Sequence, residues 1–112
     1  MSRVLPQPQV GELDLVSVLH ALSDPIRLEI VRELAHDGDG RPCGSFDVPV
    51  TKSTLTHHFR VLREAGVLAQ RHDGTTKLCT LRAGDLEMRF PGLLDAVLSA
   101  TPERPAVAPV AS

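Results

Sequence analysis

Apolar residues recur at helical spacing along the first third of the chain and predict two helices. The inward positions of the first helix are Leu15, Val18, Leu19 and Leu22. Asp24 is a favourable N-cap and Pro25 suits the first helical position, so a second helix should run over residues 25–35. Residues 41–50 are rich in proline and glycine, and we expect only a short irregular helix there, around residues 45–48.

A longer and more regular helix is predicted over residues 52–65. Thr51 can cap its start, and Gly66 stands where a left-handed residue commonly ends a helix. Its apolar residues fall at positions i, i+4 and i+7 and should face the core: Leu55, Phe59 and Leu62. The opposite face of this helix is polar, so we expect it to be turned to solvent.

A hairpin and an interrupted helix complete the pattern. Residues 67–72 and 75–81 are strand-like runs separated by an Asp-Gly pair, which favours a tight turn. Residues 83–100 are helical in pattern but are interrupted at Pro91. The order helix, helix, short helix, helix, hairpin, helix predicts a mainly α-helical fold with a small β-hairpin, the winged helix-turn-helix.

The 112 residues suffice for one domain, which we place at residues 11–100. Residues 1–10 and 101–112 are rich in proline and small residues and are expected to be disordered tails. Two apolar stripes in the predicted domain lack an internal partner, which favours their burial against a second copy of the chain. The predicted dimer interface consists of Leu13, Val16, Leu93, Leu94, Val97 and Leu98.

The net charge of −2 conceals an uneven distribution along the chain. Residues 51–82 carry six lysines and arginines but only two carboxylates. A basic segment on an otherwise acidic protein concentrates positive potential where a polyanion can dock. Charge alone fits a solvated face equally well, but a basic hairpin directly after a polar helix favours DNA.

The helix over residues 52–65 is predicted to enter the major groove of double-stranded DNA, which admits one helix. Short hydroxyls and an imidazole at its exposed N-terminal end can reach base edges: Ser53, Thr54, Thr56 and His57. Lys52 and Arg60 are placed to contact phosphates, which fix the register of binding without reading sequence. The hairpin, or wing, spans residues 67–81 and should contact the flanking backbone or minor groove through Arg71, His72, Thr75, Thr76 and Lys77.

Two runs of sequence resemble the ArsR/SmtB family of bacterial transcriptional regulators. They are LSDPIRLEIVRELA at residues 22–35 and STLTHHFRVLREAGVL at residues 53–68, followed by Arg71 and Gly74 in the hairpin. The resemblance covers residues 13–100, and its most specific parts are the His-His pair and the LREAG ending. It implies a homodimer joined through the first and last helices, usually a repressor that blocks polymerase. Activation is the alternative and would require an accessory protein partner or a particular promoter geometry.

The sequence leaves more than one candidate for the effector to which such a regulator responds. The form of the chain around Cys43 resembles an actinobacterial branch with members linked to nickel-dependent gene control. Cys43 and Cys79 lie far apart and are interpreted as thiols. The family's Cys-x-Cys site has one cysteine here and the last helix has no histidine, so nickel or zinc ligands are sought among His20, His36 and His72. A redox-responsive Cys43 thiol is the alternative.

Other functional classes fit the sequence less well. Nothing marks an oxyanion site or a substrate pocket, so we do not expect an enzyme. A module whose basic face binds an acidic protein is a further alternative, and the salt dependence of DNA binding separates it from a regulator. No run approaches the ~20 apolar residues of a membrane span and the N-terminus lacks a secretory signal, so we expect a cytoplasmic protein without membrane contact.

Overall fold

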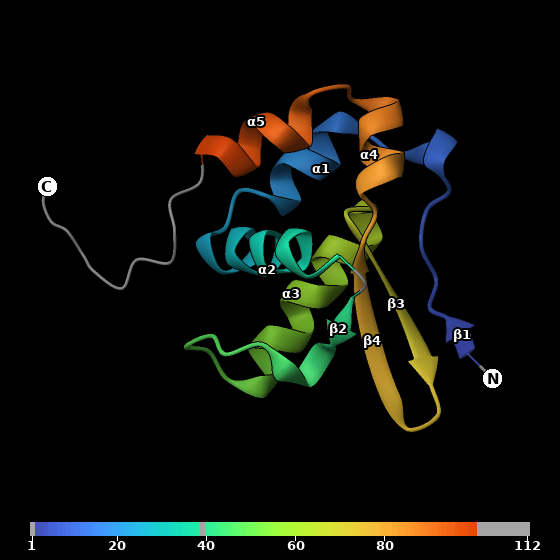
Figure 1. Ribbon diagram of the computed structural model, residues 1–112, viewed down its shortest axis with the longest axis vertical. Helices are drawn as coiled ribbons and strands as arrows, with labels where there is room; N and C mark the ends of the chain where they lie inside the picture. The colour runs from blue at the N-terminus through green and yellow to red at the C-terminus, as the bar shows by residue number, and fades with distance from the viewer. Residues whose placement is uncertain (1, 39, 101–112) are drawn as a thin grey trace, which may run out of the picture.

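The computed structural model describes residues 2–38 and 40–100 and shows the predicted mainly α-helical winged helix-turn-helix fold (Figure 1). Its α-helices are α1 (Leu15–Ala21), α2 (Pro25–Asp37), α3 (Lys52–Ala65), α4 (Ala83–Arg89) and α5 (Leu93–Ala100). Its strands are β1 (Ser2–Val4), β2 (Arg41–Pro42), β3 (Leu68–Asp73) and β4 (Thr76–Leu81), and its 3-10 helices are η1 (Val10–Glu12) and η2 (Cys43–Ser45). None of the described helices is long and apolar enough to cross a membrane.

Side-chain caps explain where three of the helices begin. Asp14 accepts a hydrogen bond from the Ser17 backbone N–H at 3.0 Å before α1. Asp24 accepts from two backbone N–H groups in the first turn of α2. The Thr51 hydroxyl accepts from the Thr54 N–H at 3.2 Å before α3. Each bond satisfies an amide that helix geometry leaves unpaired, and the predicted caps Asp24 and Thr51 are confirmed.

The core lies between α2, α3 and one face of the sheet. It contains Ile30, Val31 and Leu34 of α2 and the predicted inward residues Phe59 and Leu62 of α3, with Leu55 partly buried against them. The final helix is interrupted as predicted, because α4 ends at Arg89 and α5 begins at Leu93, on either side of Pro91. These elements form the rigid base on which the polar face of α3 is presented.

Helix α1 turns a different face to the core than its apolar pattern indicated. Leu15 and Leu19, expected inward, are 43% and 45% exposed, whereas Leu13, expected at a subunit interface, is 2% exposed. Leu13 is buried because it lies against Gly66, where an added Cβ would collide with the Leu13 side chain. Gly66 also has a φ of +88°, so the junction of α3 and β3 requires glycine both for its backbone conformation and for space.

The sheet is larger than the predicted hairpin. Strands β3 and β4 pair antiparallel along their whole length, which confirms the wing. Strand β1 adds to the free edge of β3 and β2 adds to β4, giving the order β1-β3-β4-β2. Residues 1–10 were expected to be a tail but contain this edge strand, because its backbone groups pair with the open edge of β3. The other predicted tail, residues 101–112, lies outside the described residues.

Cys43 and Cys79 are not the separate thiols inferred from the sequence. They form a disulfide whose Cα atoms are 5.6 Å apart. Strand pairing brings them together, because Arg41 of β2 lies opposite Cys79 and Cys43 follows two residues later. The short helix in this segment is η2, which ends where the helix predicted around residues 45–48 was expected to begin.

Candidate nucleic-acid interface

Helix α3 presents the polar face that the sequence predicted. Its 14 residues span about 21 Å at the rise of an α-helix, enough to lie along the floor of a major groove about 12 Å wide. The side chains predicted to contact DNA from this helix are all exposed: Lys52, Ser53, Thr54, Thr56, His57 and Arg60. The N-terminal half of α3 is therefore accessible to a nucleic acid.

Local hydrogen bonds set what each hydroxyl on this face can offer a ligand. The Thr51 hydroxyl donates to Thr54 Oγ1 at 2.9 Å, so the Thr54 hydroxyl keeps its own proton for a ligand among the described contacts. The Thr56 hydroxyl donates to the Lys52 carbonyl at 3.0 Å and can therefore only accept from a ligand. Ser53 Oγ lies 3.3 Å from Thr51 Oγ1. Thr54 is thus suited to a base acceptor and Thr56 to a base donor.

The adjacent histidines of α3 occupy different surroundings. His57 is exposed beside Thr54, whereas His58 is 8% exposed and its Nδ1 accepts from Arg27 Nη1 at 3.1 Å. Burial lowers the pKa of His58 below its ordinary value of 6.5 and Arg27 adds to this effect, although the Asp24 carboxylate 3.9 Å away opposes it. His58 is therefore a neutral packing residue between α2 and α3, and His57 is the histidine available to DNA.

Lysines and arginines divide into two groups by their contacts. One group donates to oxygens of the protein itself: Arg27, Arg32, Arg41, Arg63, Arg82 and Arg89. Within residues 2–38 and 40–100, no side-chain hydrogen bond or ion pair holds the others, which are Arg3, Lys52, Arg60, Arg71 and Lys77. All of the second group lie on α3 or on the three strands β1, β3 and β4.

The wing places the two cations among its predicted DNA contacts, Arg71 and Lys77, on opposite faces. Lys77 lies opposite His72 and shares a face with buried Gln70, whose side-chain oxygen accepts from Arg63 of α3 at 2.6 Å. That face is turned toward α3. Arg71 directly precedes His72 in β3, so its side chain lies on the other face of the sheet. The polar residues at the turn, Thr75 and Thr76, are exposed as predicted.

The two predicted contact regions lie at the same end of the molecule. Figure 1 shows the start of α3 and the turn between β3 and β4 at its lower end, whereas α1, α4 and α5 lie at the upper end. A ligand at the lower end can therefore meet α3 and the wing together, as a helix in a groove and a hairpin beside it require.

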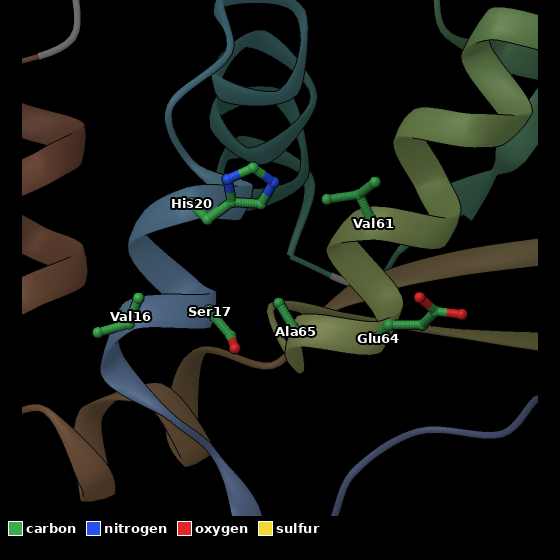
Figure 2. Close-up of a pocket in the computed structure, with 6 residues that line it drawn as sticks. All are labelled: Val16, Ser17, His20, Val61, Glu64 and Ala65. Atoms are coloured by element: carbon green, nitrogen blue, oxygen red, sulfur yellow. The ribbon is translucent and has the colours of Figure 1, made fainter.

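A pocket of about 470 Å³ opens between α1 and α3 near the other end of α3 (Figure 2). Val16, Ser17 and His20 line one wall, and Val61, Glu64 and Ala65 line the other. The metal-ligand candidates His20, His36 and His72 belong to α1, α2 and β3, and the described residues contain no group of three or more His, Cys, Asp or Glu able to hold a metal ion. The described residues of one chain therefore do not fit a nickel or zinc site.

The residues expected at a dimer interface fall into two sets. Leu94 is 8% exposed and belongs to the core, as Leu13 does, so both were wrongly assigned to an interface surface. Three residues of α5 are half-buried against the core: Leu93, Val97 and Leu98. Val16 is 73% exposed and, with Leu15 and Leu19, forms an apolar stripe on α1, which we call the α1 stripe.

Two features of this region were missed at the level of sequence. The first is Arg3, one of the unpaired cations. It was missed because β1 is only three residues long and is followed by a proline-rich segment. The disulfide joins η2, which precedes α3, to β4 of the wing, and Gln70 Nε2 donates to Cys43 Sγ at 3.3 Å. Neither feature follows from periodicity, because both depend on which strands pair.

Comparisons with known proteins agree with this arrangement. A helix-turn-helix domain family matches residues 22–71, which run from the end of α1 into β3. An uncharacterized HTH-type transcriptional regulator of Bacillus subtilis is 38% identical over 82 residues, covering 71% of this chain and 82% of the relative. Another from Methanocaldococcus jannaschii is 34% identical over 59 residues, covering 52% of this chain and 66% of the relative. The chain therefore belongs to the family of helix-turn-helix transcriptional regulators, which bind DNA.

Proposed function

We propose that the chain binds a specific operator as a homodimer, with α3 in the major groove and the wing on the flanking backbone. The observation that carries this proposal is the position of the unpaired cations. Most other arginines donate hydrogen bonds to the protein's own oxygens, whereas Lys52, Arg60 and Lys77 are left for an external anion. Phosphate groups of a duplex are spaced to meet cations on both α3 and the wing.

Sequence reading is assigned to His57 and Thr54, with Ser53 and Thr56 beside them. Both assigned side chains are short, so the helix backbone can approach the base edges closely. Thr54 retains a hydroxyl proton among the described contacts, and the His57 ring carries one donor and one acceptor when neutral. Thr75 and Thr76 at the tip of the wing, with Arg71 behind them, are assigned to the sugar-phosphate backbone.

Selection from a randomised duplex pool, followed by fluorescence anisotropy, tests this assignment. His57→Ala should reduce the preference for the selected operator over a scrambled duplex by ~1 to 3 kcal/mol for a lost base contact. His36→Ala is the matched control, because His36 is an exposed histidine near the end of α2. The assignment would be contradicted if His57→Ala kept the wild-type preference for the operator over the scrambled duplex. It would also be contradicted if His57→Ala and His36→Ala lost this preference equally.

The homodimer is assigned to the α1 stripe. Leu15, Val16 and Leu19 expose apolar surface side by side on one short helix, and Val16 also lines the pocket toward α3 (Figure 2). Exposed apolar surface of this kind is characteristic of subunit contacts. A second copy packed on α1 would place its own stripe against this one, as a two-fold interface requires, and a side chain of that copy could enter the pocket.

Light scattering tests the interface. Val16→Glu with Leu19→Glu should give a particle of one-chain mass, because two charges would be buried in an apolar contact. Val4→Glu is the control, since Val4 is 55% exposed on β1. Substitution of Leu94 is unsuitable because that residue is in the core. An unchanged mass for the double variant at micromolar concentration would place the contact elsewhere.

We also propose that the regulator belongs to the ArsR/SmtB family, which the two sequence runs quoted above resemble, and that it acts in the cytoplasm. Repression is the proposed outcome, because a dimer on an operator obstructs polymerase without needing any further surface. A promoter fusion with and without the gene for this chain tests the sign. Higher expression in its absence is expected, and lower expression would indicate activation.

A redox-responsive regulator is a second candidate, favoured by the disulfide between η2 and the wing. Reduction by a dithiol would transfer two electrons and two protons to the bridge, and a peroxide would reverse this with release of two waters. Cys43 is the sulfur open to attack, since it is 8% exposed while Cys79 is fully buried. Operator affinity should differ between reduced and oxidised protein, and the double variant Cys43→Ser, Cys79→Ser should not respond. Equal affinities would remove this candidate.

A further inference from the structure

Strand β1 makes the far end of the wing three-stranded. Ser2–Val4 pair antiparallel with β3, and the Leu5 N–H continues the ladder by donating to the Gln70 carbonyl at 2.9 Å. Figure 1 shows β1 beside the lower part of β3, at the end of the molecule where α3 begins. The N-terminal segment therefore belongs to the surface that faces the proposed DNA.

The strand register aligns three basic side chains in one row. Arg3 lies opposite His72 in β3, and His72 lies opposite Lys77 in β4. Residues directly opposite one another in an antiparallel sheet share a face, with Cβ atoms about 4.5–5.5 Å apart. This row shares its face with buried Gln70, which is the face turned toward α3. We call Arg3, His72 and Lys77 the basic row.

The basic row lacks a negative partner in the described part of the chain. Arg3 and Lys77 flank His72 across the strands, so two positive charges share this row and an anion beside it would offset them. The nearest carboxylate along β3 is that of Asp73, but its register position places it on the opposite face. No ion pair within residues 2–38 and 40–100 includes a member of the row.

We propose that the basic row binds the sugar-phosphate backbone of DNA beside the groove that α3 enters, so that β1 is part of the DNA-binding surface. This inference about the basic row rests on the proposed function. Arg3 can donate two parallel hydrogen bonds to one phosphate, and Lys77 supplies a charge at the other end of the row. His72 between them can donate a further hydrogen bond. A duplex that contacts α3 and the wing brings its backbone to this face.

Salt-dependent anisotropy with operator and scrambled duplexes tests the proposal. Arg3→Gln should weaken binding to both duplexes by a similar factor and flatten the slope of log K against log salt by about 0.9, the value for one phosphate. Arg3→Lys should restore the slope, because the charge is kept. Arg32→Gln is the matched control, since it removes the same charge from α2, where Arg32 pairs with Glu29.

The outcomes separate this inference from the proposed function. An unchanged slope for Arg3→Gln, while the wild-type protein binds its operator with a steep slope, would overturn the role of β1 alone. Failure of the wild-type protein to bind any duplex would overturn the proposed function. Inorganic phosphate at constant ionic strength distinguishes a free-anion site: phosphate binding that requires Arg3 but does not compete with the duplex would overturn the assignment to the DNA backbone.

Discussion

The outer face of α3 and the junction between α2 and α3 use the same kinds of side chain in opposite ways. His57 and Arg60 on the outer face are exposed and have no hydrogen-bond or ion-pair partner among the described residues. At the junction, His58 and Arg27 are each 8% exposed and bonded to each other. Adjacent positions on α3 thus carry a side chain available to a ligand and one that holds the helices together.

The difference shows how a protein of net charge −2 can bind a polyanion. Its overall charge says little, because many of its arginines are held by hydrogen bonds to the protein's own carbonyls or by ion pairs with its carboxylates. Those that remain unpaired lie on α3, β1 and β3, where they contribute to a local positive potential. Substitutions at the junction should therefore change stability, and substitutions on the outer face should change DNA binding without changing stability.

The largest effect is expected from Arg27→Ala. Arg27 Nε donates to the Ala21 carbonyl at 2.7 Å and Nη1 to His58, so its loss leaves buried acceptors in both α1 and α3 without a donor. We expect a loss of about 3 kcal/mol in the free energy of unfolding, measured by urea denaturation. DNA affinity of the fraction that remains folded should be close to wild type. A stability loss below ~0.5 kcal/mol would show that the junction does not depend on this side chain.

A pair of arginines three residues apart on α3 compares the two regions most closely. Arg63 donates to Gln70 and to the Pro6 carbonyl, whereas Arg60 has no described partner. Arg63→Gln should cost about 1–2 kcal/mol of stability. Arg60→Gln should leave stability within ~0.5 kcal/mol but weaken binding to every duplex. The reverse pattern would mean that the contacts of these two arginines do not reflect their roles.

A smaller effect is expected from pH. Because burial lowers the pKa of His58, the unfolded chain binds a proton more readily than the folded chain. The stabilising contribution of His58 is therefore complete above pH 6.5 and is lost as the pH falls through 6.5 toward the lower pKa of the folded state. His58→Gln should flatten the stability curve between about pH 5 and 7 relative to wild type. Parallel curves for the two proteins would contradict the buried neutral imidazole.

Periodicity and capping residues predicted the helices well. Asp24, Thr51 and Gly66 set local hydrogen bonds and dihedral angles, so their effects can be inferred from neighbours in sequence. The exposed face of α3 follows from the same spacing. The wing was identified by its Asp-Gly turn, which is also a local signal.

The remaining features depend on contacts between distant segments. Burial of Leu13 follows from the close approach of η1 and α1 to Gly66, which the apolar pattern of a seven-residue helix does not record. The Cys43–Cys79 pair and the alignment of Arg3 with Lys77 follow from strand register. The sequence alone therefore predicted which polar residues of α3 are exposed but did not distinguish the two faces of the wing.

The central claim is that the unpaired cations of α3 and the wing bind DNA phosphates. The most direct measurement compares the salt dependence of operator binding for wild type and for the triple variant Lys52→Gln, Arg60→Gln, Lys77→Gln. The slope of log K against log salt should flatten by about 0.9 for each lost phosphate contact, hence by ~3 in the triple variant, with its unfolding curve unchanged. A slope equal to that of wild type would contradict the claim, because the duplex would then be held by some other surface.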